Sequence, residues 1–169
     1  KKTFTASNGK TIDVPDKLNG EALIYATLNA AKNAGVKMRG HVLTWHSQTP
    51  EGFFREKYSK DGALVSKEVM TARHEWYIKT VLDCVVQWEK ANGYAGKETG
   101  NHLIWAWDVV NEAMADDAGT TYTGTNQNWL RGSTSETQGK DPADGGCRWY
   151  EICKNEEFII NAFRFANAY

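Results

Sequence analysis

Apolar residues recur along this chain at helical spacing in some segments and in the pattern of strands in others. The succession of these patterns predicts the order helix, strand, helix, strand, helix. Residues 21–34 carry apolar side chains at helical spacing, and Gly35 suits the left-handed position that often follows a helix. A long helix is predicted over residues 66–91, with Ser66 as its N-cap. Helical spacing returns over residues 149–169.

Two segments between these helices have the composition of strands. Residues 36–45 form one, and residues 103–110 form an almost continuous apolar run that predicts a buried strand. Such strands alternating with helices imply an α/β fold, with a parallel sheet that helices cover on both faces. Two strands cannot form a stable parallel sheet alone, because both edges stay unpaired. We therefore expect the remaining strands to come from other residues of the same protein or from a second chain.

The rest of the chain is predicted to be irregular. Residues 1–20 are expected to be a loop or junction, since they contain turn signals such as Asn19-Gly20. Residues 116–146 are dense in Gly, Thr, Ser, Asn and Asp and are expected to be a long polar insertion. The 169 residues would then form one part of a single domain.

Composition narrows the range of partners. Twenty basic and 21 acidic residues balance each other, which argues against nucleic acid, and no apolar run approaches the ~18 residues of a membrane span. The chain has three cysteines, and Cys147 and Cys153 can be either a local disulfide or free, partly buried thiols. Its seven tryptophans suit the flat faces of sugar rings, although most aromatic residues serve core packing.

The strongest chemical signal lies at the end of the second predicted strand, in residues 107–113 (WDVVNEA). In a barrel of alternating strands and helices the active face is formed by the carboxyl ends of the strands, where Asn111 and Glu112 fall. A partly desolvated Glu can hold a raised pKa and protonate a leaving group at neutral pH. The alternative is a solvated Glu that caps a following helix.

A second signal runs off the end of the first predicted strand, in residues 39–48 (RGHVLTWHSQ). Alternation places His41, Leu43 and Trp45 on one face. We reject a metal site at His41 and His46, because no third ligand stands at a recognisable spacing. A satisfied buried histidine and a core tryptophan are the structural alternatives. No Gly-rich phosphate loop is flanked by strand and helix in the required order, so no cofactor is expected.

Together these segments resemble glycoside hydrolase family 10, whose best-known members are endo-1,4-β-xylanases. The resemblance rests on residues 38–50 (MRGHVLTWHSQTP), which are long and specific, and on residues 107–113, which alone would also suit other families of the same clan. It spans roughly residues 20–169, apart from the insertion near 118–146. It implies a (β/α)8 TIM barrel, of which this chain is an incomplete portion with the third and fourth strands.

The resemblance also implies a retaining endo-1,4-β-xylanase that works by double displacement. It assigns the acid/base to Glu112, the 2-hydroxyl contact of the cleaved sugar to Asn111, and the lining of that subsite to His41, Trp45 and Gln48. His46 would support these side chains from behind, and the His41–Val42 peptide would be cis. Non-proline cis bonds are costly and cluster at functional sites.

A retaining hydrolase needs a second carboxyl group about 5–5.5 Å from the first. Asp108 is the nearest candidate, but four residues along a strand span ~13 Å, so we expect it to be a buried structural acid. In the family the nucleophile lies on the seventh strand, downstream of this chain. The segment alone is therefore expected to be inactive.

Two other functions stay open at this point: a β-1,4-glucanase of the same clan, and a non-catalytic carbohydrate-binding barrel. The expected partner is xylan or a xylo-oligosaccharide. Since xylan is too large to enter most cells, the resemblance implies an extracellular or cell-surface location.

Overall fold

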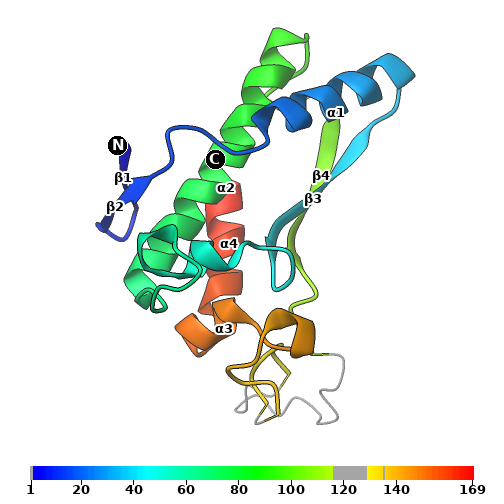
Figure 1. Ribbon diagram of the computed structural model, residues 1–169. Coiled ribbons are helices and arrows are strands. Elements are labelled where there is room, and N and C mark those ends of the chain that lie inside the picture. The colour runs from blue at the N-terminus through cyan, green and yellow to red at the C-terminus, as the bar shows by residue number, and fades with distance from the viewer. Residues whose placement is uncertain (1, 116–128, 135) are drawn as a thin grey trace.

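The computed structural model describes residues 2–115, 129–134 and 136–169, and its arrangement is shown in Figure 1. Its elements in chain order are β1 (Lys2–Thr5), β2 (Thr11–Val14), α1 (Glu21–Ala34), β3 (Met38–Trp45), α2 (Lys67–Ala91), β4 (Ile104–Asn111), α3 (Arg148–Cys153) and α4 (Glu157–Ala168). Short 3-10 helices lie at Glu51–Phe54, Glu56–Tyr58 and Pro142–Asp144.

The first two predicted helices are confirmed, with their caps. Gly35 follows α1 with φ 68°, and the Ser66 hydroxyl accepts a hydrogen bond from the Val69 amide at the start of α2. The single helix expected over residues 149–169 is wrong, because the chain breaks into α3 and α4. Lys154 adopts φ 61° between them and turns the chain. Apolar spacing continues on both sides of this turn, so periodicity alone did not reveal it.

The two predicted strands are confirmed as a parallel pair, in which Met38 lies opposite Ile104 and Trp45 opposite Asn111. Gly40 is required by close packing, because a Cβ there would lie 2.3 Å from the ring of Trp107. The peptide between residues 41 and 42 is cis, as the resemblance implied.

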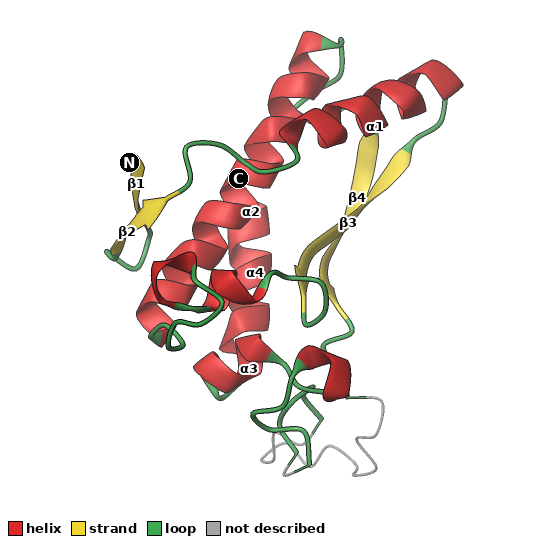
Figure 2. Ribbon diagram, in the orientation of Figure 1, coloured by secondary structure: helices red, strands yellow, loops and turns green. Residues whose placement is uncertain are grey.

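Helices α2 and α4 lie on one side of the strand pair (Figure 2). The core between them consists of Leu43, Ile78, Val81, Leu82, Ala162 and Phe165. Deeper toward α3, the fully buried His74 ring shares a 2.7 Å hydrogen bond with the Thr44 hydroxyl. The expectation of a wholly buried second strand is wrong for this chain: the residues of β4 are partly exposed, and Trp105 is 64% exposed. The described helices cover one face of the pair.

The expected loop at residues 1–20 is also wrong in part, because β1 and β2 pair as an antiparallel hairpin. Apolar side chains of the hairpin, including Ile12 and Val14, pack on Ala72 of α2. The buried Glu75 carboxylate accepts hydrogen bonds from Ser7 and, on its other oxygen, from the Tyr169 hydroxyl. This one side chain of α2 therefore ties the hairpin to the residue that follows α4.

Cys84, Cys147 and Cys153 are free thiols. Burial raises the pKa of Cys147 to about 11 and that of Cys153 to about 12, so both are protonated near neutral pH. None of the described helices is long and apolar enough to cross a membrane.

Candidate active site

The site is built where β3 and β4 end side by side. Glu112 directly follows β4, in a left-handed conformation with φ 50°. Its Oε2 accepts a 2.8 Å hydrogen bond from the indole Nε1 of Trp45, the last residue of β3. The Glu112 side chain is 50% exposed, so the carboxyl group is held by the neighbouring strand and still reaches solvent. Residues 113–115 are not helical, which excludes a helix-capping role.

The backbone around Glu112 is fixed by a buried arginine. Arg131 Nε donates to the Glu112 carbonyl at 2.9 Å, and Nη2 donates to the Met114 carbonyl at 2.9 Å. The Arg131 amide also donates to the carbonyl of Ala113. Sequence reasoning missed Arg131 because it lies in the stretch assigned to a polar insertion. The apolar pair just before it, at residues 129 and 130, was the available signal.

His41 is oriented by Asp108 of the neighbouring strand, and the ring Nδ1 lies 3.0 Å from Oδ2 of the carboxylate. Arg39 binds the same carboxylate, and this contact, with that of His41, lowers the Asp108 pKa. Because an ionised carboxylate only accepts hydrogen bonds, Nδ1 of His41 carries a proton, and Nε2 of the neutral ring is left to accept one. The expectation of a buried Asp108 is wrong, since its side chain is 24% exposed beside the open face of the strands.

His41, Trp45 and Gln48 line a cleft of about 270 Å³. Gln48 is exposed and has φ 59°, which turns the chain after the strand. The other residues that line the cleft are largely apolar or small: Val42, Leu43, Ser47, Thr49, Pro50, Phe53, Tyr77 and Trp149. Three of the four predicted binding residues thus share one cleft. Asn111 and Glu112 lie at its margin, outside the lining.

Two hydrogen bonds hold the backbone of Trp45. Its carbonyl accepts from the Trp149 indole at 2.9 Å and from the Thr49 hydroxyl at 3.1 Å. His46 lies behind, only 10% exposed, with Nδ1 3.8 Å from Oε2 of Glu112. Sequence reasoning missed Trp149, because a contact across 104 positions leaves no local signal.

The arrangement suits proton transfer beside a bound ring. It combines a carboxyl group that reaches solvent, an imidazole nitrogen able to accept a hydrogen bond, and an aromatic cleft. Among residues 2–115, 129–134 and 136–169, no group of three or more His, Cys, Asp or Glu is placed to hold a metal ion.

Comparison with known proteins gives consistent matches. The family model "Glycosyl hydrolase family 10" matches residues 22–169. Endo-1,4-beta-xylanase Y of Acetivibrio thermocellus is 33% identical over 99% of this chain and 13% of its own length. A putative endo-1,4-beta-xylanase of Caldicellulosiruptor saccharolyticus is 36% identical over 84% of this chain and 35% of its own. The chain therefore spans about a third or less of these relatives.

Solved structures match in the same way. The CBM22-1-GH10 modules of a Clostridium thermocellum endo-1,4-beta-D-xylanase, complexed with xylohexaose, align with a TM-score of 0.66 and 31% identity. The alignment covers 85% of this chain and 24% of that one. The parallel strands β3 and β4 and the helices packed on them are thus a portion of a (β/α)8 barrel, as the resemblance implied.

Proposed function

This chain belongs to glycosyl hydrolase family 10, and on that premise we propose that the polypeptide carrying it is a retaining endo-1,4-β-xylanase. The observation that carries the proposal is the Glu112 carboxyl group, bound by the Trp45 indole where two parallel strands end. Relatives named as endo-1,4-β-xylanases, and a structural neighbour complexed with xylohexaose, support xylan as the substrate.

In the proposed first step, Glu112 donates its proton to the glycosidic oxygen while a carboxylate attacks the anomeric carbon. The bond between that carbon and the oxygen breaks, and a covalent glycosyl-enzyme forms. Glu112, now a carboxylate, then takes a proton from water, whose oxygen attacks the anomeric carbon and releases the sugar. We propose that the nucleophilic carboxylate comes from residues outside this chain, so that these 169 residues alone do not turn over substrate.

The neighbouring side chains have separate proposed tasks. Nε2 of His41 accepts a hydrogen bond from a sugar hydroxyl, because Asp108 holds the proton on Nδ1. Asn111 binds the 2-hydroxyl of the same sugar, and Gln48 binds a hydroxyl from the cleft wall. His46 supports Glu112 and Trp45 from behind.

The test uses the full polypeptide that contains this chain. We expect it to hydrolyse xylan far faster than carboxymethyl-cellulose, and to release products whose anomeric configuration is retained in early NMR spectra. Equal or faster cleavage of carboxymethyl-cellulose would replace xylan with a β-1,4-glucan. If the polypeptide cleaves neither polymer, the remaining interpretation is a non-catalytic carbohydrate-binding barrel.

We also propose that the protein works outside the cell or at its surface, because xylan is too large to enter most cells. Fractionation of the producing cells checks this point. Activity confined to the soluble cell contents would contradict it.

A further inference from the structure

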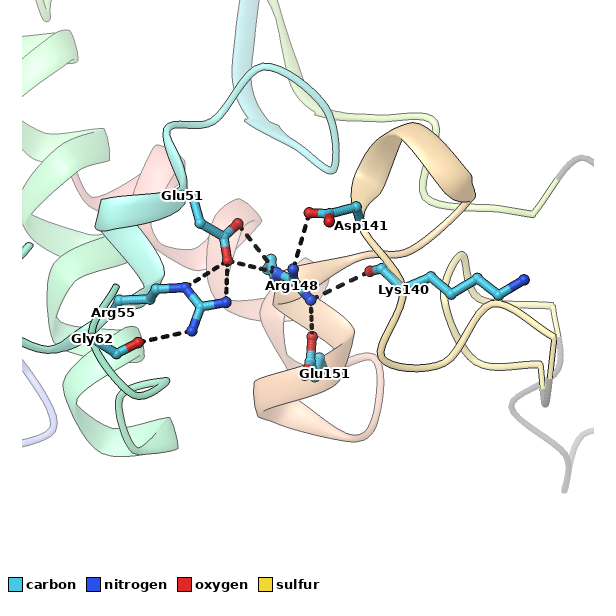
Figure 3. Close-up of polar contacts among 7 residues, drawn as sticks. All are labelled: Glu51, Arg55, Gly62, Lys140, Asp141, Arg148 and Glu151. Atoms are coloured by element: carbon cyan, nitrogen blue, oxygen red, sulfur yellow. Dashed lines mark hydrogen bonds and ion pairs between the residues drawn. The ribbon is translucent and has the colours of Figure 1, made fainter. Parts of the chain in front are cut away.

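We propose that Arg148 is a positioning residue for Glu112, acting through Glu51 and Trp45; this inference rests on the proposed function. Arg148 is the first residue of α3, and its side chain is only 7% exposed. Figure 3 shows it at the centre of a group of carboxylates and carbonyls that come from separate segments. None of these groups belongs to the cleft.

The guanidinium of Arg148 joins the segment after β3 to the segment before α3. Its Nε donates to both oxygens of Glu51, at 3.0 and 3.2 Å. Nη1 donates to the Lys140 carbonyl and to Glu151, and Nη2 donates to Asp141 at 3.1 Å. A planar fork of five donors can serve these directions together, whereas a lysine ammonium is a single point.

The two segments joined by Arg148 and Glu51 both deliver a hydrogen bond to one atom, the Trp45 carbonyl. Thr49, two residues before Glu51, donates its hydroxyl to this carbonyl. Trp149, the residue after Arg148, donates its indole N–H to it. The ion pair therefore holds two donors on the backbone of Trp45, and the Trp45 indole in turn binds the Glu112 carboxyl group.

The consequence is specific to proton donation. If Arg148 is lost, the loop with Thr49 and the start of α3 can separate, and the Trp45 indole no longer fixes Glu112. A displaced acid slows cleavage when the leaving group needs a proton, and leaves cleavage nearly unchanged when it does not. Partial unfolding would lower both rates equally, so the leaving group separates positioning from stability.

The experiment measures kcat/KM of the full polypeptide on xylo-oligosaccharides and on a 2,4-dinitrophenyl β-xylobioside, whose leaving group needs no proton. For Arg148→Met we expect about a tenfold loss on the oligosaccharides and about a twofold loss or less on the aryl glycoside. The matched control is Arg55→Met. Arg55 binds the same Glu51 carboxylate from the other side but adjoins neither Thr49 nor Trp149. The control should show no such selectivity.

Two further variants decide the question if Arg148→Met does not fold. Arg148→Lys should show an intermediate selective loss. Trp149→Phe keeps an aromatic ring against Phe54 and His74 but removes the indole donor. Because Trp149 also lines the cleft, both rates should fall, and the loss on the oligosaccharides should exceed that on the aryl glycoside by about fivefold, as for Arg148→Met. Equal losses on both substrates, or a selective loss in Arg55→Met, would overturn the inference while the proposed function stands. A wild-type polypeptide inactive on both substrates would overturn the two together.

Discussion

Two glutamates stand at opposite ends of β4 and differ in how completely they are bound. Glu89 of α2 lies at the amino end with its side chain 3% exposed. It accepts hydrogen bonds from the Leu103 and Ile104 amides at 2.8 and 3.2 Å, and its other oxygen lies 2.9 Å from Nδ1 of His102. Glu112, at the carboxyl end, has the Trp45 indole bond and is half exposed. Glu89, with hydrogen-bond partners on both carboxylate oxygens, fixes the start of the strand. Glu112, with its carboxyl group half exposed, can exchange protons with a substrate.

The largest expected effect separates the two glutamates by activity. In the full polypeptide, Glu112→Gln keeps an acceptor for the Trp45 indole but cannot donate or take the catalytic proton. We expect kcat/KM on xylan to fall by about 10²–10⁴-fold, with the free energy of unfolding within about 0.5 kcal/mol of wild type. Aryl glycosides with good leaving groups should be affected least. Unchanged xylan hydrolysis would remove Glu112 from the mechanism.

The reverse behaviour is expected at Glu89. Glu89→Ala leaves two amides and His102 without their acceptor, and we expect a loss of about 3 kcal/mol in the free energy of unfolding, measured in urea. Activity per folded molecule should stay unchanged. The exposed Glu98 supplies a control, because Glu98→Ala should change stability by less than about 0.5 kcal/mol. A Glu89→Ala protein that keeps its stability but loses activity would show that Glu89 serves catalysis and not stability.

The sequence predicted the helices and strands because their signals are local. The apolar period, Gly35 and Ser66 marked α1 and α2 to within a residue. The β1–β2 hairpin was missed because each strand has only four residues, and its burial depends on distant Ala72. The break at Lys154 was missed because a lysine in a left-handed conformation carries no glycine signal.

For the candidate site, sequence similarity located the side chains at the cleft and His46 behind them, but not the two residues that hold the backbone around Glu112 and Trp45. His41 and Trp45 fall in a recognisable motif, and the cleft brings them together with Gln48. Arg131 and Trp149 act on the site through bonds to backbone carbonyls. Such contacts depend on how distant segments pack, so a motif does not record them.

A third prediction concerns His74, the buried side chain behind Trp45. Burial lowers the pKa of His74 to about 3, from an unfolded value of about 6.5. Between these values the unfolded chain binds the extra proton, so the contribution of His74 to stability is present above pH 6.5 and is lost as the pH falls. We expect the free energy of unfolding to drop by about 2 kcal/mol between pH 7 and pH 5 from this group.

The matched variant is His74→Gln, which can still reach the Thr44 hydroxyl but does not titrate. Its stability at pH 7 should be lower than that of wild type, and its change between pH 7 and pH 5 should be smaller by about 2 kcal/mol. Identical pH dependence in the two proteins would show that His74 does not resist protonation in the folded state.

The smallest expected effect concerns Asp108, which is intermediate between the two glutamates because it is partly exposed and binds both Arg39 and His41. In Asp108→Asn the amide can donate to Nδ1 of His41, which moves the ring proton to Nε2 and removes the acceptor offered to the sugar. We expect about a tenfold loss of kcat/KM on xylan, near 1.4 kcal/mol, with stability little changed. Arg39→Met is the control, since it leaves the bond between Asp108 and His41 intact and should cost less. If Arg39→Met lowers kcat/KM as much as Asp108→Asn does, then Asp108 contributes through charge and not by setting the position of the His41 ring proton.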